Sequence, residues 1–173
     1  MSDPDLQLLE ITPCPFRPLT LSSWKTFLSP DKLFVDQDAI NKPNYVRLNA
    51  WPGFLNRSIT ELACSDQSTK KNAVEIFNQL GWNFVWVKDD YGLIAARIIA
   101  MIINEAYYAL EENVSTKKQI DIAMKLGTNY PFGPFEWSEK IGLNNILQLL
   151  NHLQKQGDRY AISSLLIKES SSI

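Results

Sequence analysis

The sequence predicts two lobes of different class, a small α/β lobe followed by an all-α lobe. The first, residues 1–90, alternates short apolar runs with one amphipathic helix, and a strand–helix–strand order is typical of a small, largely parallel sheet. From Gly92 onward the apolar residues recur at helical spacing, and the polar stretch Lys88–Tyr91 separates the two patterns. The predicted domains are therefore 1–90 and 91–173.

Short apolar runs bounded by polar residues or proline predict the elements of the first lobe. The predicted strands and apolar runs are Leu6–Ile11, Leu33–Val35, Tyr45–Leu48, Ser58–Ala63 and Asn83–Val87, with a short helix from Ser22 or Ser23 to Phe27. Ser68–Leu80 is a predicted amphipathic helix that Gly81 ends, because its apolar residues recur near every 3.6 positions. Alternation in the last strand places Phe84 and Trp86 on one face.

The second lobe is predicted to begin with one long helix, Leu93–Glu112. Its polar residues Arg97, Asn104 and Glu111 recur every seventh position, so they share one face. The helices predicted after it are Ser115–Leu126 with Gly127 at its end, Phe135–Ile141, Asn144 or Asn145 to Gln154, and Asp158–Lys168 with a frayed tail at Ser170–Ser172.

Composition is typical of a soluble globular protein. Of the 173 residues, 45% are hydrophobic and 21% charged, and the net charge of −2 gives no footprint for nucleic acid. Cys14 and Cys64 form no CxxC pattern and the N-terminus resembles no signal peptide, so we expect reduced thiols and a cytoplasmic protein. The apolar run Leu93–Ile103 contains Arg97 and is too short to span a bilayer, and no side-chain cluster has metal-ligand spacing.

The segment Lys125–Trp137, KLGTNYPFGPFEW, is the most distinctive stretch of the chain. Glycines and prolines crowd it and aromatic residues interleave with them, which predicts a rigid loop anchored in a core. Glu136 is expected to cap or lock this loop.

The second lobe resembles the C-terminal helical domain of 3-hydroxyacyl-CoA dehydrogenases. The matching pieces are GLIAARII (Gly92–Ile99), NEAYYALEE (Asn104–Glu112), IDIAMKL (Ile120–Leu126), YPFGPFE, Gly142–Leu143 and GDRY (Gly157–Tyr160). The resemblance implies an all-α lobe like the C-terminal domain of 6-phosphogluconate dehydrogenase. Because this lobe forms the dimer in 3-hydroxyacyl-CoA dehydrogenases, the resemblance also implies a homodimer. Upstream, Tyr45–Val87 resembles the last part of the family's nucleotide-binding domain, which implies a truncated Rossmann-like lobe.

The same resemblance places the family's catalytic positions. In the family a histidine accepts the substrate's hydroxyl proton and a glutamate orients it, but Asn49 stands at the histidine position, and an amide cannot act as a base at neutral pH. Glu61 falls on the glutamate. Ala96 replaces a family asparagine before the retained Arg97, and a family serine aligns loosely with Asp36 or Asp38.

The family uses NAD, and the sequence predicts no cofactor in this chain. Dinucleotide binding needs a glycine-rich strand–turn–helix of the G-x-G-x-x-G type. The first glycine of the chain is Gly53, so no such turn precedes the predicted helix at Ser68, and the segment before Asn49 is too short for a complete dinucleotide fold.

The remaining candidates are weighed toward structural roles. His152, the single histidine, is expected on the exposed side of a helix. Glu61 is expected to be a surface or capping group, and Arg97 to be in an ion pair, with contact to an acyl-CoA phosphate as the alternative. Tryptophans are expected in cores or interfaces: Trp51, Trp82, Trp86 and Trp137.

Two functions remain open from the sequence. The first is a degenerate, non-catalytic relative of the dehydrogenases that dimerises or binds acyl-CoA in the cleft between its lobes. The alternative is a working NAD-dependent 3-hydroxyacyl-CoA dehydrogenase of fatty-acid metabolism that a partner chain completes. Nucleic acid and membrane are not expected partners.

Overall fold

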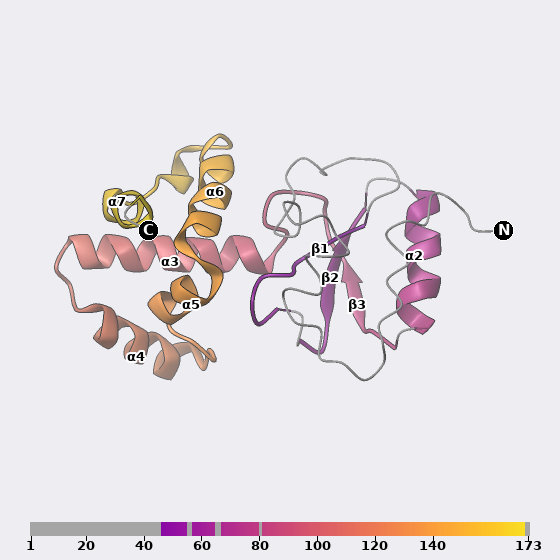
Figure 1. Cartoon of the computed structure of the whole chain (residues 1–173), viewed down its shortest axis with the longest axis horizontal. Helices are drawn as coiled ribbons and strands as arrows, with labels where there is room; N and C mark the ends of the chain where they lie inside the picture. Colours follow the sequence, from indigo (N-terminus) through magenta and orange to yellow (C-terminus); the bar gives the residue numbers. More distant parts are fainter. Residues whose placement is uncertain (1–45, 55–56, 65–66, 80, 172–173) are drawn as a thin grey trace. The chain divides into compact units, whose positions relative to one another are not determined.

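The computed structural model describes residues 46–54, 57–64, 67–79 and 81–171. The chain divides into two compact units, Met1–Ile94 and Ala95–Ile173. The first unit carries a small sheet and the second is helical, which confirms the predicted fold class (Figure 1). The elements predicted between Leu6 and Val35 lie outside the described residues.

The sheet has three short strands among the described residues, in the order β1 (Arg47–Leu48), β2 (Thr60–Ala63), β3 (Phe84–Trp86). Helix α2 (Gln67–Gln79) joins β2 to β3, which run parallel. The largely parallel sheet of the prediction is wrong for β1, which pairs antiparallel with β2. A parallel crossover needs a dozen or more residues and usually a helix, whereas residues 49–59 are only eleven and those of them that the structure describes form no helix.

The two faces of the sheet differ in character. The register pairs Leu48 with Leu62 and Leu62 with Trp86, and these side chains pack with Phe84 around the buried Ala73 and Phe77 of α2. This confirms the predicted face of β3, since Val85 is 46% exposed. Alternation along the strands places Arg47 and Glu61 on the opposite face.

In the helical unit, the long helix α3 (Ala95–Glu111) lies against three later helices (Figure 1). The elements after α3 are α4 (Lys117–Thr128), α5 (Pro134–Ile141), α6 (Leu143–Gln154), the 3-10 turn η3 (Asp158–Tyr160) and α7 (Ser164–Ser170). Among the described residues, none of the helices has the length and apolar character needed to cross a bilayer.

Helix boundaries differ from the prediction where backbone angles or caps decide them. Helix α3 begins at Ala95 because Gly92 and Leu93 both have left-handed backbones, with φ of 74° and 47°. Helix α4 is capped by Thr116, whose hydroxyl accepts from the Gln119 backbone. Gly127 lies inside α4, which ends at left-handed Asn129 (φ 54°). A short polar side chain tolerates that conformation, so the helix does not need a glycine there.

The predicted polar face of α3 binds the C-terminal segment. Arg97 donates to the Gln156 side chain at 3.3 Å, and Glu111 accepts from the backbone N–H of Leu165. Between them Asn104, which is 2% exposed, donates to the Ala161 carbonyl at 2.7 Å and accepts from the Ser163 N–H at 3.0 Å. The shared face is therefore confirmed.

Asn104 also explains why the predicted helix Asp158–Lys168 is broken. The backbone of Ala161 and Ser163 is bonded to the Asn104 side chain instead of continuing the helix, so η3 stops and α7 starts anew. The Ser163 hydroxyl then caps α7 by accepting from the Leu166 N–H at 3.2 Å.

Helix α7 remains ordered to its end, and the predicted frayed tail is wrong at Ser170, which is helical and 4% exposed. Glu169 accepts from the Tyr107 hydroxyl at 2.8 Å and from Lys117 at 2.6 Å. Burial would raise the pKa of Glu169, but these two hydrogen bonds outweigh it and lower that pKa. Burial and the bond to Glu169 together raise the pKa of Tyr107 far above its usual value.

We expect Asn104→Ala to lower the free energy of unfolding by about 2–4 kcal/mol, because it leaves two backbone groups without their partner in a buried site. Urea unfolding followed by far-ultraviolet circular dichroism measures this. The control is Asn151→Ala, an exposed position on α6 where alanine favours the helix slightly. Equal effects of the two substitutions would show that Asn104 does not hold the C-terminal segment.

Candidate functional site

Asn49 follows β1 directly and is buried, with 4% of its surface exposed. Its side-chain oxygen accepts a hydrogen bond from the backbone N–H of Trp51 at 3.2 Å. This is an Asx turn, in which the side chain fixes the backbone two residues on. Its amide nitrogen is buried and has no hydrogen-bond partner among the described residues. The oxygen of Asn49 is therefore committed to local structure.

Glu61 lies on β2 and is partly exposed. The antiparallel register pairs Arg47 with Ala63 and Leu48 with Leu62, so one further step along the strands sets Asn49 opposite Glu61. The Glu61 carboxylate accepts from the backbone N–H of Ile94 at 3.3 Å. Glu61 thus accepts a hydrogen bond from a backbone N–H group, as expected for a capping residue.

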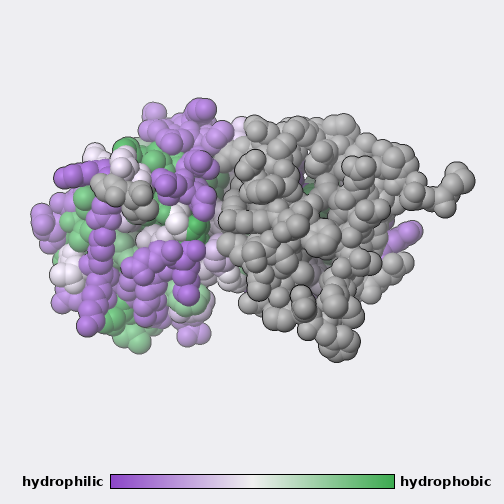
Figure 2. Space-filling view, viewed as in Figure 1, coloured by the Kyte–Doolittle hydropathy of each residue, from purple (hydrophilic) through white to green (hydrophobic). Residues whose placement is uncertain are grey.

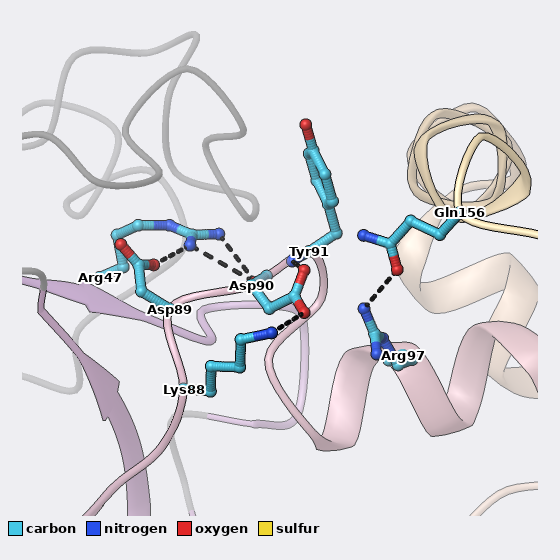
Figure 3. A network of polar contacts seen from close by, with 7 residues as sticks. All are labelled: Arg47, Lys88, Asp89, Asp90, Tyr91, Arg97 and Gln156. Atoms are coloured by element: carbon cyan, nitrogen blue, oxygen red, sulfur yellow. Dashed lines mark hydrogen bonds and ion pairs between the residues drawn. The ribbon is translucent and has the colours of Figure 1, made fainter.

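Ala96 and Arg97 lie in the first turns of α3, in the helical unit. Ala96 is fully buried, whereas Arg97 is partly exposed. Figure 3 shows Arg97 directed toward Gln156, and its guanidinium also lies 5.9 Å from the centre of the Tyr160 ring. Arg97 therefore contacts at least an amide and an aromatic ring of its own unit.

The other candidates divide between core and surface. Trp51 and Trp137 are buried at 1% and 3% exposure, and Trp82 and Trp86 pack against the core of the sheet unit, as expected for structural tryptophans. His152 lies on α6, as predicted, and is partly buried, where a solvent-exposed position was expected. Asp36 and Asp38 lie outside the described residues. No cluster of potential metal ligands occurs in the described part of the chain.

The loop between α4 and α5 is held by two carboxylates. Glu136 accepts from the Gly133 N–H at 3.0 Å and forms an ion pair with Lys125, which confirms that it locks the loop. Asp121 of α4 accepts from the Phe135 N–H at 2.8 Å, so it caps the start of α5 from another helix. Sequence reasoning missed Asp121, because its partner is fourteen positions away and no local motif marks it.

The pKa values of Asp121 and Glu136 are shifted in opposite directions. Burial raises the pKa of Asp121, and the hydrogen bond from Phe135 only partly opposes it. The hydrogen bond from Lys125, followed by that from Gly133, lowers the pKa of Glu136. Both carboxylates thus have defined structural partners in the loop.

The segment between β2 and α2 lacks the sequence pattern of a dinucleotide-binding turn. In the strand–helix–strand unit β2–α2–β3, the residues between β2 and α2 are, in sequence, Cys64-Ser65-Asp66. A pyrophosphate needs glycines there so that the backbone can approach it, and an acidic side chain opposes a second negative charge. The sequence of this segment is therefore unlike that of a pyrophosphate-binding turn.

Comparison with known proteins identifies the relatives of the chain. Residues 92–170 match the family described as 3-hydroxyacyl-CoA dehydrogenase, C-terminal domain. The 3-hydroxyadipyl-CoA dehydrogenase of Escherichia coli K12 is 39% identical over 111 residues, covering 63% of this chain and 23% of that protein. The resemblance to the family is thereby confirmed.

Solved structures of 3-hydroxybutyryl-CoA dehydrogenases are also similar to this chain. The crystal structure of 3-hydroxybutyryl-CoA dehydrogenase from Escherichia coli K12 matches with a TM-score of 0.62 and 34% identity, over 72% of this chain and 27% of that one. The crystal structure of (S)-3-hydroxybutyryl-CoA dehydrogenase from Ralstonia eutropha matches with a TM-score of 0.66 and 25% identity. This match covers 75% of this chain and 47% of that one. The matched region thus spans less than half of each relative's length.

Gly133→Ala should destabilise the helical unit by about 1–3 kcal/mol, because the added Cβ would overpack the loop. It would lie 2.3 Å from the Asp121 carboxylate oxygen and 2.5 Å from the Asp121 Cα. Thermal and urea unfolding measure the loss.

Gly127→Ala is the matched control, because it lies in α4 with no atom within 4 Å of an added Cβ. There alanine should stabilise by about 0.5–1 kcal/mol. A neutral Gly133→Ala variant would mean that the loop does not depend on its approach to Asp121.

Proposed function

We propose that this chain, whose residues 92–170 match the C-terminal domain of 3-hydroxyacyl-CoA dehydrogenases, is a non-catalytic relative that self-associates or binds acyl-CoA. Alone, it neither oxidises a 3-hydroxyacyl-CoA nor binds NAD. The observation that carries the proposal is Asn49, which stands where the family resemblance places the catalytic histidine.

Chemistry at Asn49 supports this reading. A dehydrogenase of this family needs a base that takes the hydroxyl proton as hydride leaves, and a carboxamide has no basic site at neutral pH. The Asn49 oxygen already accepts from the Trp51 N–H, so it is also engaged in the turn. The glycine-free sequence Cys64–Asp66 supports the second half of the proposal, the lack of an NAD site in this chain.

A working dehydrogenase completed by a partner chain is the alternative, and one observation favours it. The resemblance aligns Glu61 with the family's orienting carboxylate, and extending the β1–β2 register by one pair would bring it opposite Asn49. In this alternative the partner supplies both the NAD site and the missing base.

The distribution of buried and exposed apolar side chains in the helical unit bears on self-association. The apolar run expected to form a dimer interface is used internally, since α3 buries Ala96, Ile99, Ala100 and Ile103. Apolar side chains nevertheless remain exposed on three helices: Ile98 of α3, Ile122 and Leu126 of α4, the second of these at 82%, and Ile167 of α7. Figure 2 shows hydrophobic side chains of this unit reaching the surface among hydrophilic ones.

When the wild-type chain is incubated with 3-hydroxybutyryl-CoA and NAD, we expect no NADH above background. The absorbance of NADH measures this. Asn49→His should be equally inactive, because a restored base does not create a phosphate-binding turn. A 3-hydroxybutyryl-CoA dehydrogenase serves as positive control. Turnover by the wild-type chain would refute the proposal, whereas turnover only after adding a second chain would establish the alternative.

Binding is tested separately from activity. Saturating acyl-CoA should raise the melting temperature, because a ligand that binds only the native state stabilises it by mass action. Light scattering with and without acyl-CoA gives the mass of the species present. A strict monomer with no thermal shift would remove both the self-associating and the acyl-CoA-binding reading.

A further inference from the structure

The segment Lys88–Ile94, which we call the connector, follows β3 and leads to the first residue of α3. It is bonded at its start to a buried arginine of β1. Arg47, whose side chain is 6% exposed, forms an ion pair with Asp89, whose side chain is 8% exposed. The same guanidinium donates twice to the Asp90 carbonyl oxygen, at 3.4 Å each (Figure 3).

At its far end the connector is bonded to β2. The Ile94 backbone N–H donates to Glu61 at 3.3 Å. Arg47 and Glu61 come from neighbouring antiparallel strands and share the sheet face that α2 does not cover. Two side chains of one sheet face therefore hold the two ends of the connector.

Between these ends the connector has an unfavourable backbone. Leu93 is 5% exposed and adopts a left-handed φ of 47°, directly after Gly92 at 74°. That conformation is costly for a residue with a Cβ and persists only where surrounding contacts fix it. Internal hydrogen bonds contribute, since the Leu93 N–H donates to the Asp90 carbonyl at 3.3 Å and the Tyr91 N–H to the Asp90 carboxylate at 2.8 Å.

We infer that Arg47 and Glu61 form a two-point clamp that fixes the conformation of the connector. Arg47 holds Asp89 and Asp90, and Glu61 holds the backbone of Ile94. In this chain the carboxylate at the family's glutamate position is thus a positioning group for the backbone, and its presence requires no histidine partner. The clamp is independent of whether acyl-CoA binds.

Hydrogen exchange of the connector amides, resolved by NMR on the full chain, tests the clamp. Glu61→Ala removes the acceptor and should speed exchange at Ile94 about fivefold or more, because a hydrogen bond to a charged group is lost. Glu61→Gln keeps a side-chain oxygen and should retain most of the protection. Glu75→Ala, an exposed glutamate on α2, should leave the connector unchanged.

The Arg47 end is tested by Asp89→Asn, which keeps the shape of the side chain and removes its charge. Exchange should then rise at residues 89–91 more than at Ile94. Unchanged Ile94 exchange in Glu61→Ala, or the same change in Glu75→Ala, would overturn the Glu61 anchor. Unchanged exchange at residues 89–91 in Asp89→Asn would overturn the Arg47 anchor.

Discussion

The buried amide of Asn104 is the contact on which the order of the helical unit depends. A carboxamide carries one donor and one acceptor group, and Asn104 uses both on the backbone of the C-terminal segment, at Ala161 and Ser163. These bonds end η3 and place Ser163 where its hydroxyl can cap α7. Helix α7 in turn brings Glu169 to Tyr107 and Lys117, so one side chain in the middle of α3 fixes the C-terminal segment from Ala161 onward.

Much of this architecture could be predicted from the sequence because it rests on periodicity. The seven-residue spacing of Arg97, Asn104 and Glu111 gave the polar face of α3, and the alternation of Phe84 and Trp86 gave the buried face of β3. The break at Ala161–Ser163 could not be predicted in this way, since a distant side chain causes it. The antiparallel direction of β1 was missed for a similar reason, because pairing direction depends on the length and path of a connection.

The candidate site divides along the same line. Asn49 and Glu61 could be located because the resemblance supplies their spacing, and the strand register then sets the two positions opposite each other. Arg47 could not, since a single arginine in a two-residue strand carries no pattern and its buried partner Asp89 lies far along the chain. Asp121 was missed likewise, although its capping of Phe135 is central to the most distinctive loop of the sequence.

The polar face of α3, formed by Arg97, Asn104 and Glu111, also restricts how the length of this helix can vary among related chains. A single inserted or deleted residue between Arg97 and Asn104 would turn one half of the helix by about 100° relative to the other. Asn104 and Glu111 would then leave the C-terminal segment together, and apolar residues would take their place against backbone groups that need partners. Seven residues make nearly two whole turns, so an insertion of seven would keep the three side chains on one face but would move Asn104 about 10 Å along the helix axis.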